Sequence, residues 1–131
     1  MFSLCIPTMD RFDNYLKIFI PKYLNNHLIN EIIITDENGN DVKKIKEMFP
    51  DNNKLKLHVN KKRLGPFLNK IQACKKAKNQ WIALIDSDNF ADKNYFNKIN
   101  NFINNNNISK NSVLSPDYGT EVFQWGHLSN F

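Results

Sequence analysis

Short apolar runs alternate with amphipathic stretches along this chain. The apolar runs have the length of strands, about four to eight residues, and several are rich in β-branched side chains, which favours buried strands. The stretches between them carry apolar residues three and four positions apart, as on one face of a helix. Strands are therefore predicted over 3–7, 31–36, 55–59, 81–85 and 112–115.

Four helices are predicted between and after these strands, over 10–24, 42–48, 64–78 and 92–104. Pro21 is expected to kink or split the first helix, because proline lacks an amide hydrogen and clashes with the preceding turn. Asp41 is expected to cap the second helix at its N-terminus. The third helix begins at Leu64-Gly65-Pro66, and its apolar stripe is predicted to be Phe67, Ile71, Cys74 and Ala77.

The alternation of strands and helices predicts an α/β fold with a mostly parallel central sheet and helices on both faces. The 131 residues suffice for one domain with its own core, so a single domain over 1–131 is expected. The runs 31–36 and 81–85 are apolar on both faces, as in central strands. In such sheets ligands bind beyond the carboxyl ends of the strands.

Polar residues follow the predicted strands where ligands are expected. Pro7-Thr8, Asp36, Asn60-Lys61-Lys62-Arg63 and Asp86-Ser87-Asp88 come directly at or after the first four strands. Parallel strands place their carboxyl ends at one edge of the sheet, so these segments are expected to converge there.

Asp86 and Asp88 are the strongest chemical signal, with Ser87 between them at the end of the most hydrophobic strand. Two carboxylates in such a position repel each other unless something compensates their charge. Mg²⁺ and Mn²⁺ prefer oxygen ligands and typically use one or two carboxylates plus substrate phosphates. The pair therefore predicts a cation site. The alternative is that Asp88 and Asn89 only cap a turn or helix.

Three further positions could contact a phosphorylated ligand. Asp36 could accept a hydrogen bond from a nucleobase or a ribose hydroxyl, or could be a solvated turn residue. Arg63 suits bidentate phosphate contact, whereas its neighbours Lys61 and Lys62 fit a solvated surface. Lys70 projects from the following helix and could reach the same pocket.

Composition narrows the classes of function. The net charge of +5 favours anionic partners, but the basic residues lack interleaved aromatic side chains, so no nucleic acid is expected as a partner. Glycine-rich phosphate loops are absent from the sequence.

The two cysteines, Cys5 and Cys74, are predicted to be buried free thiols. No apolar run approaches the roughly 20 residues that span a membrane, and residues 1–6 are too short for a signal sequence, so a cytoplasmic protein is expected.

Four segments together resemble the family 2 glycosyltransferases of the GT-A fold, a Rossmann-like fold. They are Ser3–Thr8, Glu31–Asp36, Leu64–Lys70 and Trp81–Phe90, in the order and at the spacing of that family. The resemblance covers roughly residues 3 to 118. It implies a nucleotide-diphosphate sugar as donor, Mn²⁺ or Mg²⁺ as cofactor, and transfer with inversion to a glycan, lipid or protein acceptor.

The resemblance also implies roles for individual residues. Pro7 and Thr8 would lie against the nucleoside, and Asp36 would bind the base, which points to uracil and a UDP-sugar. Arg63 would lie near the nucleotide. Asp86 and Asp88 match the family's Asp-x-Asp motif, with Asp88 as the more direct metal ligand.

The sequence departs from the family in two respects. Lys70 stands only loosely for the arginine that the family often carries on the third helix. The half of the domain that shapes the acceptor site and supplies the catalytic base is expected to be missing, which leaves Asp117 and Glu121 as weak candidates for the base. A donor-binding module without activity is therefore a second interpretation, and a basic nucleic-acid-binding domain is a less favoured third.

Overall fold

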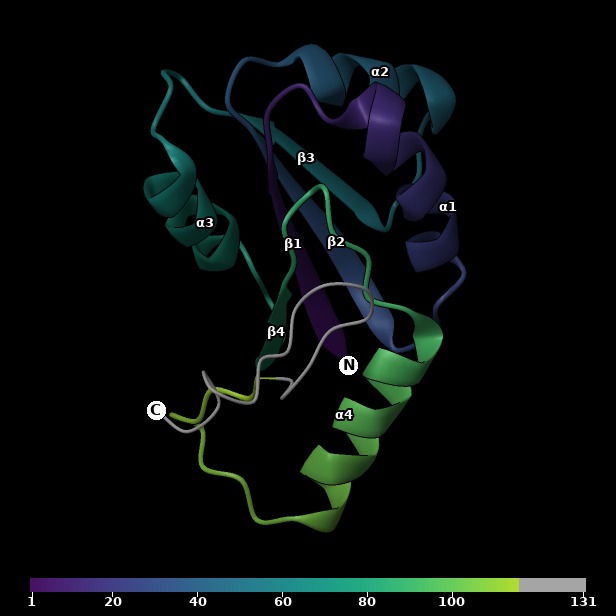
Figure 1. The fold of residues 1–131 in the computed structure, drawn as a ribbon, viewed down its shortest axis with the longest axis vertical. Coiled ribbons are helices and arrows are strands. Elements are labelled where there is room, and N and C mark those ends of the chain that lie inside the picture. Colours follow the sequence, from purple (N-terminus) through teal and green to yellow (C-terminus); the bar gives the residue numbers. More distant parts are fainter. Residues whose placement is uncertain (116–131) are drawn as a thin grey trace.

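The computed structural model describes residues 1–115, in which a parallel sheet lies between helices (Figure 1). The elements follow in this order: β1 (Phe2–Thr8), a π-helix η1 (Phe12–Leu16), α1 (Lys17–Leu24), β2 (Ile29–Asp36), α2 (Asn40–Met48), β3 (Leu55–Val59), α3 (Pro66–Lys75), β4 (Trp81–Leu84) and α4 (Lys93–Asn105). In these residues no helix is long and apolar enough to cross a membrane.

The four strands form one parallel sheet in the order β3-β2-β1-β4. The α/β fold predicted from the sequence is confirmed. Within residues 1–115 β4 lies at an edge of the sheet rather than in its centre, and the side chains of Ile82 and Leu84 are 41% and 43% exposed. The central position expected for the 81–85 strand is thus wrong, and β1 and β2 are the central strands.

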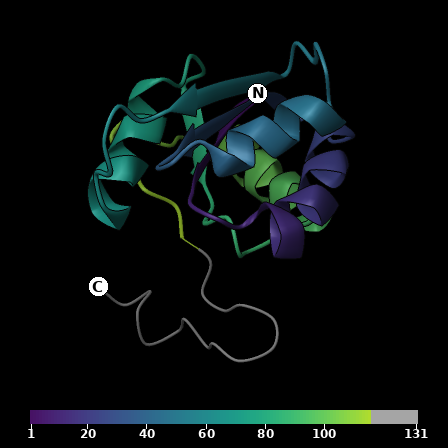
Figure 2. The same cartoon turned by 90° about the horizontal axis from the view of Figure 1, so that it is seen from above.

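Helices cover the two faces of the sheet unequally. α3 lies on one face, and α1, α2 and α4 lie on the other (Figures 1 and 2). Side chains alternate along a strand, so Leu4 and Ile6 of β1 join the large core on the three-helix face. Cys5 and Ile33 point to the opposite face, where they meet Ala73 of α3 in a small second core.

The first predicted helix is interrupted, although not at Pro21. Residues Phe12–Leu16 form a π-helical turn in which the amide of Leu16 donates to the carbonyl of Arg11. The α-helical part begins at Lys17 and contains Pro21 in its interior. The missing amide hydrogen of Pro21 therefore falls one turn after the π-helix.

Asp41 caps a different helix from the one predicted. Gly39 occupies the N-cap position of α2, and Asp41 lies buried in the first turn. Its carboxylate accepts hydrogen bonds from the amides of Arg11 and Phe12, at the start of η1, and from the Thr8 hydroxyl. Asp41 thereby ties α2 to the chain that leaves β1.

Three other expectations are corrected. The buried residues of α3 are Asn69 and Ala73, whereas Phe67 is 73% exposed. Only Cys74 and Ala77 of the predicted stripe pack on the second core. Both cysteines are free, as expected, but only Cys5 is fully buried, whereas Cys74 is partly exposed. Residues 112–115 form no strand in the structure.

Candidate functional site

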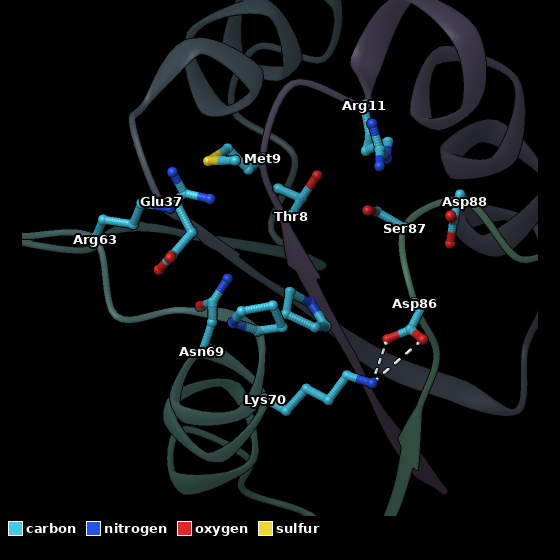
Figure 3. A pocket seen from close by; sticks show the side chains of 12 residues that line it. Thr8, Met9, Arg11, Glu37, Arg63, Asn69, Lys70, Asp86, Ser87 and Asp88 are labelled. Atoms are coloured by element: carbon cyan, nitrogen blue, oxygen red, sulfur yellow. Dashed lines mark hydrogen bonds and ion pairs between the residues drawn. The ribbon is translucent and has the colours of Figure 1, made fainter.

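A cavity of about 260 Å³ opens at the carboxyl ends of the strands (Figure 3). Its walls come from the end of β1, the start of the loop after β2, the loop before α3, the first turns of α3 and the segment after β4. The residues that line it are Pro7, Thr8, Met9, Arg11, Glu37, Arg63, Pro66, Asn69, Lys70, Asp86, Ser87 and Asp88. The volume is just below the range of about 300–1,000 Å³ that is usual for sites of drug-sized ligands.

The cavity gathers most of the side chains that the sequence singled out. Those that line it are Pro7, Thr8, Arg63, Lys70, Asp86, Ser87 and Asp88. They come from four segments that are distant in sequence and meet because all four strands run parallel. The two weak candidates for a base, Asp117 and Glu121, lie outside the described residues.

Asp36 is placed differently from what the sequence suggested. It is fully buried and absent from the lining of the cavity. Its carboxylate accepts hydrogen bonds from the amides of Asn38 and Val42, and therefore holds the turn into α2. Because side chains alternate along β2, Asp36 points to the face of α2, away from the face on which α3 lies.

Glu37, which sequence reasoning passed over, lines the cavity instead. Its carboxylate accepts hydrogen bonds from the amides of Leu64 and Gly65, at 3.0 and 2.8 Å, and from the side chain of Asn60 at 2.7 Å. Burial by itself raises the pKa of Glu37, but these hydrogen bonds outweigh burial, so the pKa lies below its usual value. Glu37 thus fixes the loop that carries Arg63. Every second side chain along a strand faces the same side, and Glu37 lies four positions after Ile33. This alternation would have indicated that Glu37 faces α3, as Ile33 does.

Asn69 holds α3 against the strand ends. Its side-chain amide donates to the carbonyl of Thr35 at 3.0 Å, and its side-chain oxygen accepts from Asn60 at 2.9 Å. Asn69 is buried, so these contacts are shielded from water. They fix the backbone of the next residue, Lys70, at the wall of the cavity.

Lys70 and Asp86 form an ion pair across the cavity (Figure 3). The ammonium group lies 2.9 Å from Oδ1 and 3.2 Å from Oδ2 of the carboxylate. Lys70 comes from α3 and Asp86 from the end of β4, so the pair joins opposite walls. Both side chains are partly exposed, at 38% and 43%.

The segment that carries Asp86 and Asp88 is anchored at both ends. The amide of Ile85 donates to the carbonyl of Cys5, and the amide of Ala91 donates to the hydroxyl of Tyr23. Burial raises the pKa of Tyr23 to about 12, so this anchor stays a neutral phenol at physiological pH. The ring of Phe90 also packs on Tyr23, with 5.1 Å between ring centroids. The backbone that carries the two carboxylates is therefore anchored to β1 and α1.

The lining of the cavity carries both signs of charge. Arg11, Arg63 and Lys70 are basic, whereas Glu37, Asp86 and Asp88 are acidic. The basic side chains suit the phosphates of an anionic ligand.

The acidic side chains provide a limited set of metal ligands. Within residues 1–115 no group of three His, Cys, Asp or Glu side chains could hold a metal ion. Asp86 and Asp88 supply two carboxylates beside the cavity, which fits a hard cation whose other ligands come from phosphate and water.

Comparison with known proteins now assigns the family. A sequence model described as glycosyl transferase family 2 matches residues 3–131, almost the whole chain. The chain belongs to glycosyl transferase family 2. A search of curated proteins finds no match.

Solved structures show the same fold as this family 2 member. TarS from S. aureus, residues 1–349, superposes with a TM-score of 0.67 at 21% identity, over 79% of this chain and 32% of TarS. The crystal structure of the same TarS segment in complex with UDP gives a TM-score of 0.63 at 19% identity, with the same coverage. The chain thus spans about a third of the TarS segment that it matches.

Proposed function

We propose that this chain binds the nucleotide-sugar donor of a glycosyltransferase, with the diphosphate in the cavity at the carboxyl ends of the strands. The observation that carries this proposal is the meeting of Asp86 and Asp88 with Arg63 and Lys70 in one cavity. Membership of glycosyl transferase family 2 supports the class of donor, and a TarS structure that contains UDP supports a UDP-sugar.

In this proposal the carboxylates of Asp86 and Asp88 hold Mn²⁺ or Mg²⁺. Such a cation stabilises the negative charge of a departing diphosphate as a Lewis acid. Lys70 and Arg63 contact the phosphates from the opposite wall.

The nucleoside is proposed to lie at the β1 and β2 side of the cavity. Pro7 and Thr8, which line the cavity, would pack against it. We assign the contact with the base to Glu37, because it lines the cavity and Asp36 does not. Asp36 then supports this contact indirectly, through the turn into α2.

Transfer itself is proposed for the whole protein. The sugar would pass with inversion to a hydroxyl of a glycan, lipid or protein, with Asp117 or Glu121 as candidates for the base that deprotonates it. An assay for UDP release with and without acceptor distinguishes a transferase from a donor-binding module that lacks activity.

A thermal-shift panel tests donor binding directly. UDP-sugars, GDP-sugars and UDP are added to the full chain with and without Mn²⁺. A ligand at one hundred times its Kd stabilises a protein by about 2.7 kcal/mol, which raises the Tm by several degrees. We expect stabilisation by a UDP-sugar that requires Mn²⁺ and disappears in Asp88→Ala.

Glu47→Ala is the matched control, because Glu47 is an exposed acidic residue of α2 outside this cavity. It should respond to the UDP-sugar as the wild type does. If no nucleotide sugar stabilises the wild-type chain with Mn²⁺, or if Asp88→Ala keeps the full response, donor binding at this site is wrong.

A further inference from the structure

Lys70 occupies one of the two carboxylates that the proposed cation needs. Its ammonium group contacts both oxygens of Asp86, whereas Asp88 has no hydrogen bond or ion pair with any residue from 1 to 115. Asp86 is therefore paired with a positive charge, whereas Asp88 is not. A cation that enters alone finds Asp88 open and Asp86 already neutralised.

We propose that Lys70 is an exchangeable counter-ion of Asp86, which a nucleoside diphosphate draws away so that Asp86 becomes free for the divalent cation. This inference rests on the proposed function, because it concerns the same cavity. It adds a mechanism by which binding of the nucleotide and binding of the cation depend on each other.

The pair has the properties of a contact that opens easily. Both side chains are partly exposed, and ion pairs in contact with water are weak because solvent screens them. Lysine carries its charge on a flexible four-carbon chain with three donors, so the ammonium can turn from a carboxylate to a phosphate without movement of the backbone.

The backbone on both sides of the pair is fixed. The buried side chain of Asn69 holds α3 to the carbonyl of Thr35 and to Asn60. The amide of Ile85 holds the end of β4 to the carbonyl of Cys5. Exchange therefore needs only a rotation of the Lys70 side chain, and Asp86 keeps its place on the segment that also carries Asp88 (Figure 3).

The exchange has a thermodynamic consequence. When a nucleotide takes the ammonium from Asp86, the cation no longer competes with Lys70 for that carboxylate. By linkage, the nucleotide and the cation then increase each other's affinity by the same factor. Removal of the lysine charge should have opposite effects on the two ligands: tighter binding of the cation alone and weaker binding of the nucleotide.

The test is a calorimetric titration of the full chain with MnCl₂ alone, with UDP alone, and with each in the presence of the other. Lys70→Met keeps the length of the side chain without its charge. We expect it to bind Mn²⁺ alone about two- to fivefold more tightly than the wild type, the factor that corresponds to an exposed ion pair. Its affinity for UDP at saturating Mn²⁺ should fall, and the factor by which UDP tightens Mn²⁺ should shrink.

Lys75→Met is the matched control, since Lys75 lies exposed on the same helix and does not line the cavity. Lys70→Arg retains the charge and should bind Mn²⁺ alone as weakly as the wild type. The inference is overturned if Lys70→Met binds Mn²⁺ alone no more tightly than the wild type, or if Lys75→Met gains as much. A wild-type chain that fails to bind UDP with Mn²⁺ would instead overturn the proposed function.

Discussion

Glu37 joins three segments of the site through a single carboxylate. Its oxygens accept hydrogen bonds from Asn60 after β3 and from Leu64 and Gly65 before α3, while its own backbone continues β2. Hydrogen bonds to a charged acceptor are stronger than those between neutral groups. The ionised form of this side chain therefore stabilises the arrangement of the loop that presents Arg63 to the cavity.

The stability of the protein should depend on the ionisation of Glu37. Its pKa is lowered in the folded chain, so its contribution is present above the unfolded value of 4.5 and is lost as the pH falls through the lower folded value. We expect Glu37→Gln to lose about 1–3 kcal/mol at pH 7, because a neutral amide replaces a charged acceptor. Urea unfolding at pH 7 and at successively lower pH values measures this.

Glu37→Gln should also have a flatter decline of stability in acid than the wild type. Glu47→Gln is a suitable comparison, since Glu47 is an exposed acidic residue of α2 that does not line the cavity. A stability curve for Glu37→Gln that runs parallel to the wild-type curve below pH 4.5 would contradict this role.

Asp41 performs a similar task between elements. It belongs to α2, but it caps η1 and accepts a hydrogen bond from Thr8 at the end of β1, at 2.6 Å. The N-terminal amides of a helix have no partners within the helix, so those of Arg11 and Phe12 depend on this carboxylate. The positions of Thr8 and Arg11 in the cavity wall thus depend on a carboxylate that belongs to α2.

Asp41→Ala should destabilise the chain by about 1–3 kcal/mol, because buried donors lose their acceptor. The same change should weaken binding of a UDP-sugar with Mn²⁺, as Thr8 and Arg11 lose their support. Chemical denaturation and the thermal-shift panel measure the two effects. Asn40→Ala, which alters an exposed neighbour in the same turn, should change both much less. Equal losses in the two variants would show that the turn as a whole, rather than the cap, is responsible.

Four of the five predicted strands and all four predicted helices are present in residues 1–115. The strand predicted at 55–59, where Leu55, Leu57 and Val59 alternate with Lys56 and His58, is confirmed over the same residues. Half of the stripe predicted for α3 was wrong: Phe67 and Ile71 are exposed, and the helix buries Asn69 and Ala73 instead, one of which is polar. A polar residue buried for its hydrogen bonds leaves no signal in a hydrophobic pattern.

The same reasoning explains which part of the site the sequence predicted. Asp86, Ser87 and Asp88 follow an apolar strand, so their place at the sheet edge could be inferred without knowledge of any contact. Asp36 and Glu37 are neighbours, and only the alternation of side chains across β2 decides which of them faces the cavity. The pairing of Lys70 with Asp86 depends on how α3 packs, which local sequence does not specify.

At the scale of the whole molecule, the two faces of the sheet differ in the depth of their cores. The face covered by α1, α2 and α4 buries a large apolar cluster, in which Phe2 and Phe96 meet edge to face. The face covered by α3 buries Cys5, Ile33 and Ala73, with Cys74 and Ala77 partly covered. Hydrophobic stabilisation grows with the apolar area removed from water, so the face under α3 contributes less of it than the other face.

This asymmetry places the smaller apolar core at the proposed ligand site. Regions with few buried apolar contacts open at lower free energy than the core, and we expect amide hydrogens of α3 to exchange faster than those of β1 and β2. A ligand that contacts Lys70 on one wall and Asp88 on the other would link α3 to the end of β4 and suppress that opening.

Hydrogen exchange measured with UDP and Mn²⁺ should therefore slow in α3. It should stay unchanged in α2, which contributes no residue to the cavity. Slowing of the same size in both helices would indicate general stabilisation of the fold and would contradict a local link through the cavity.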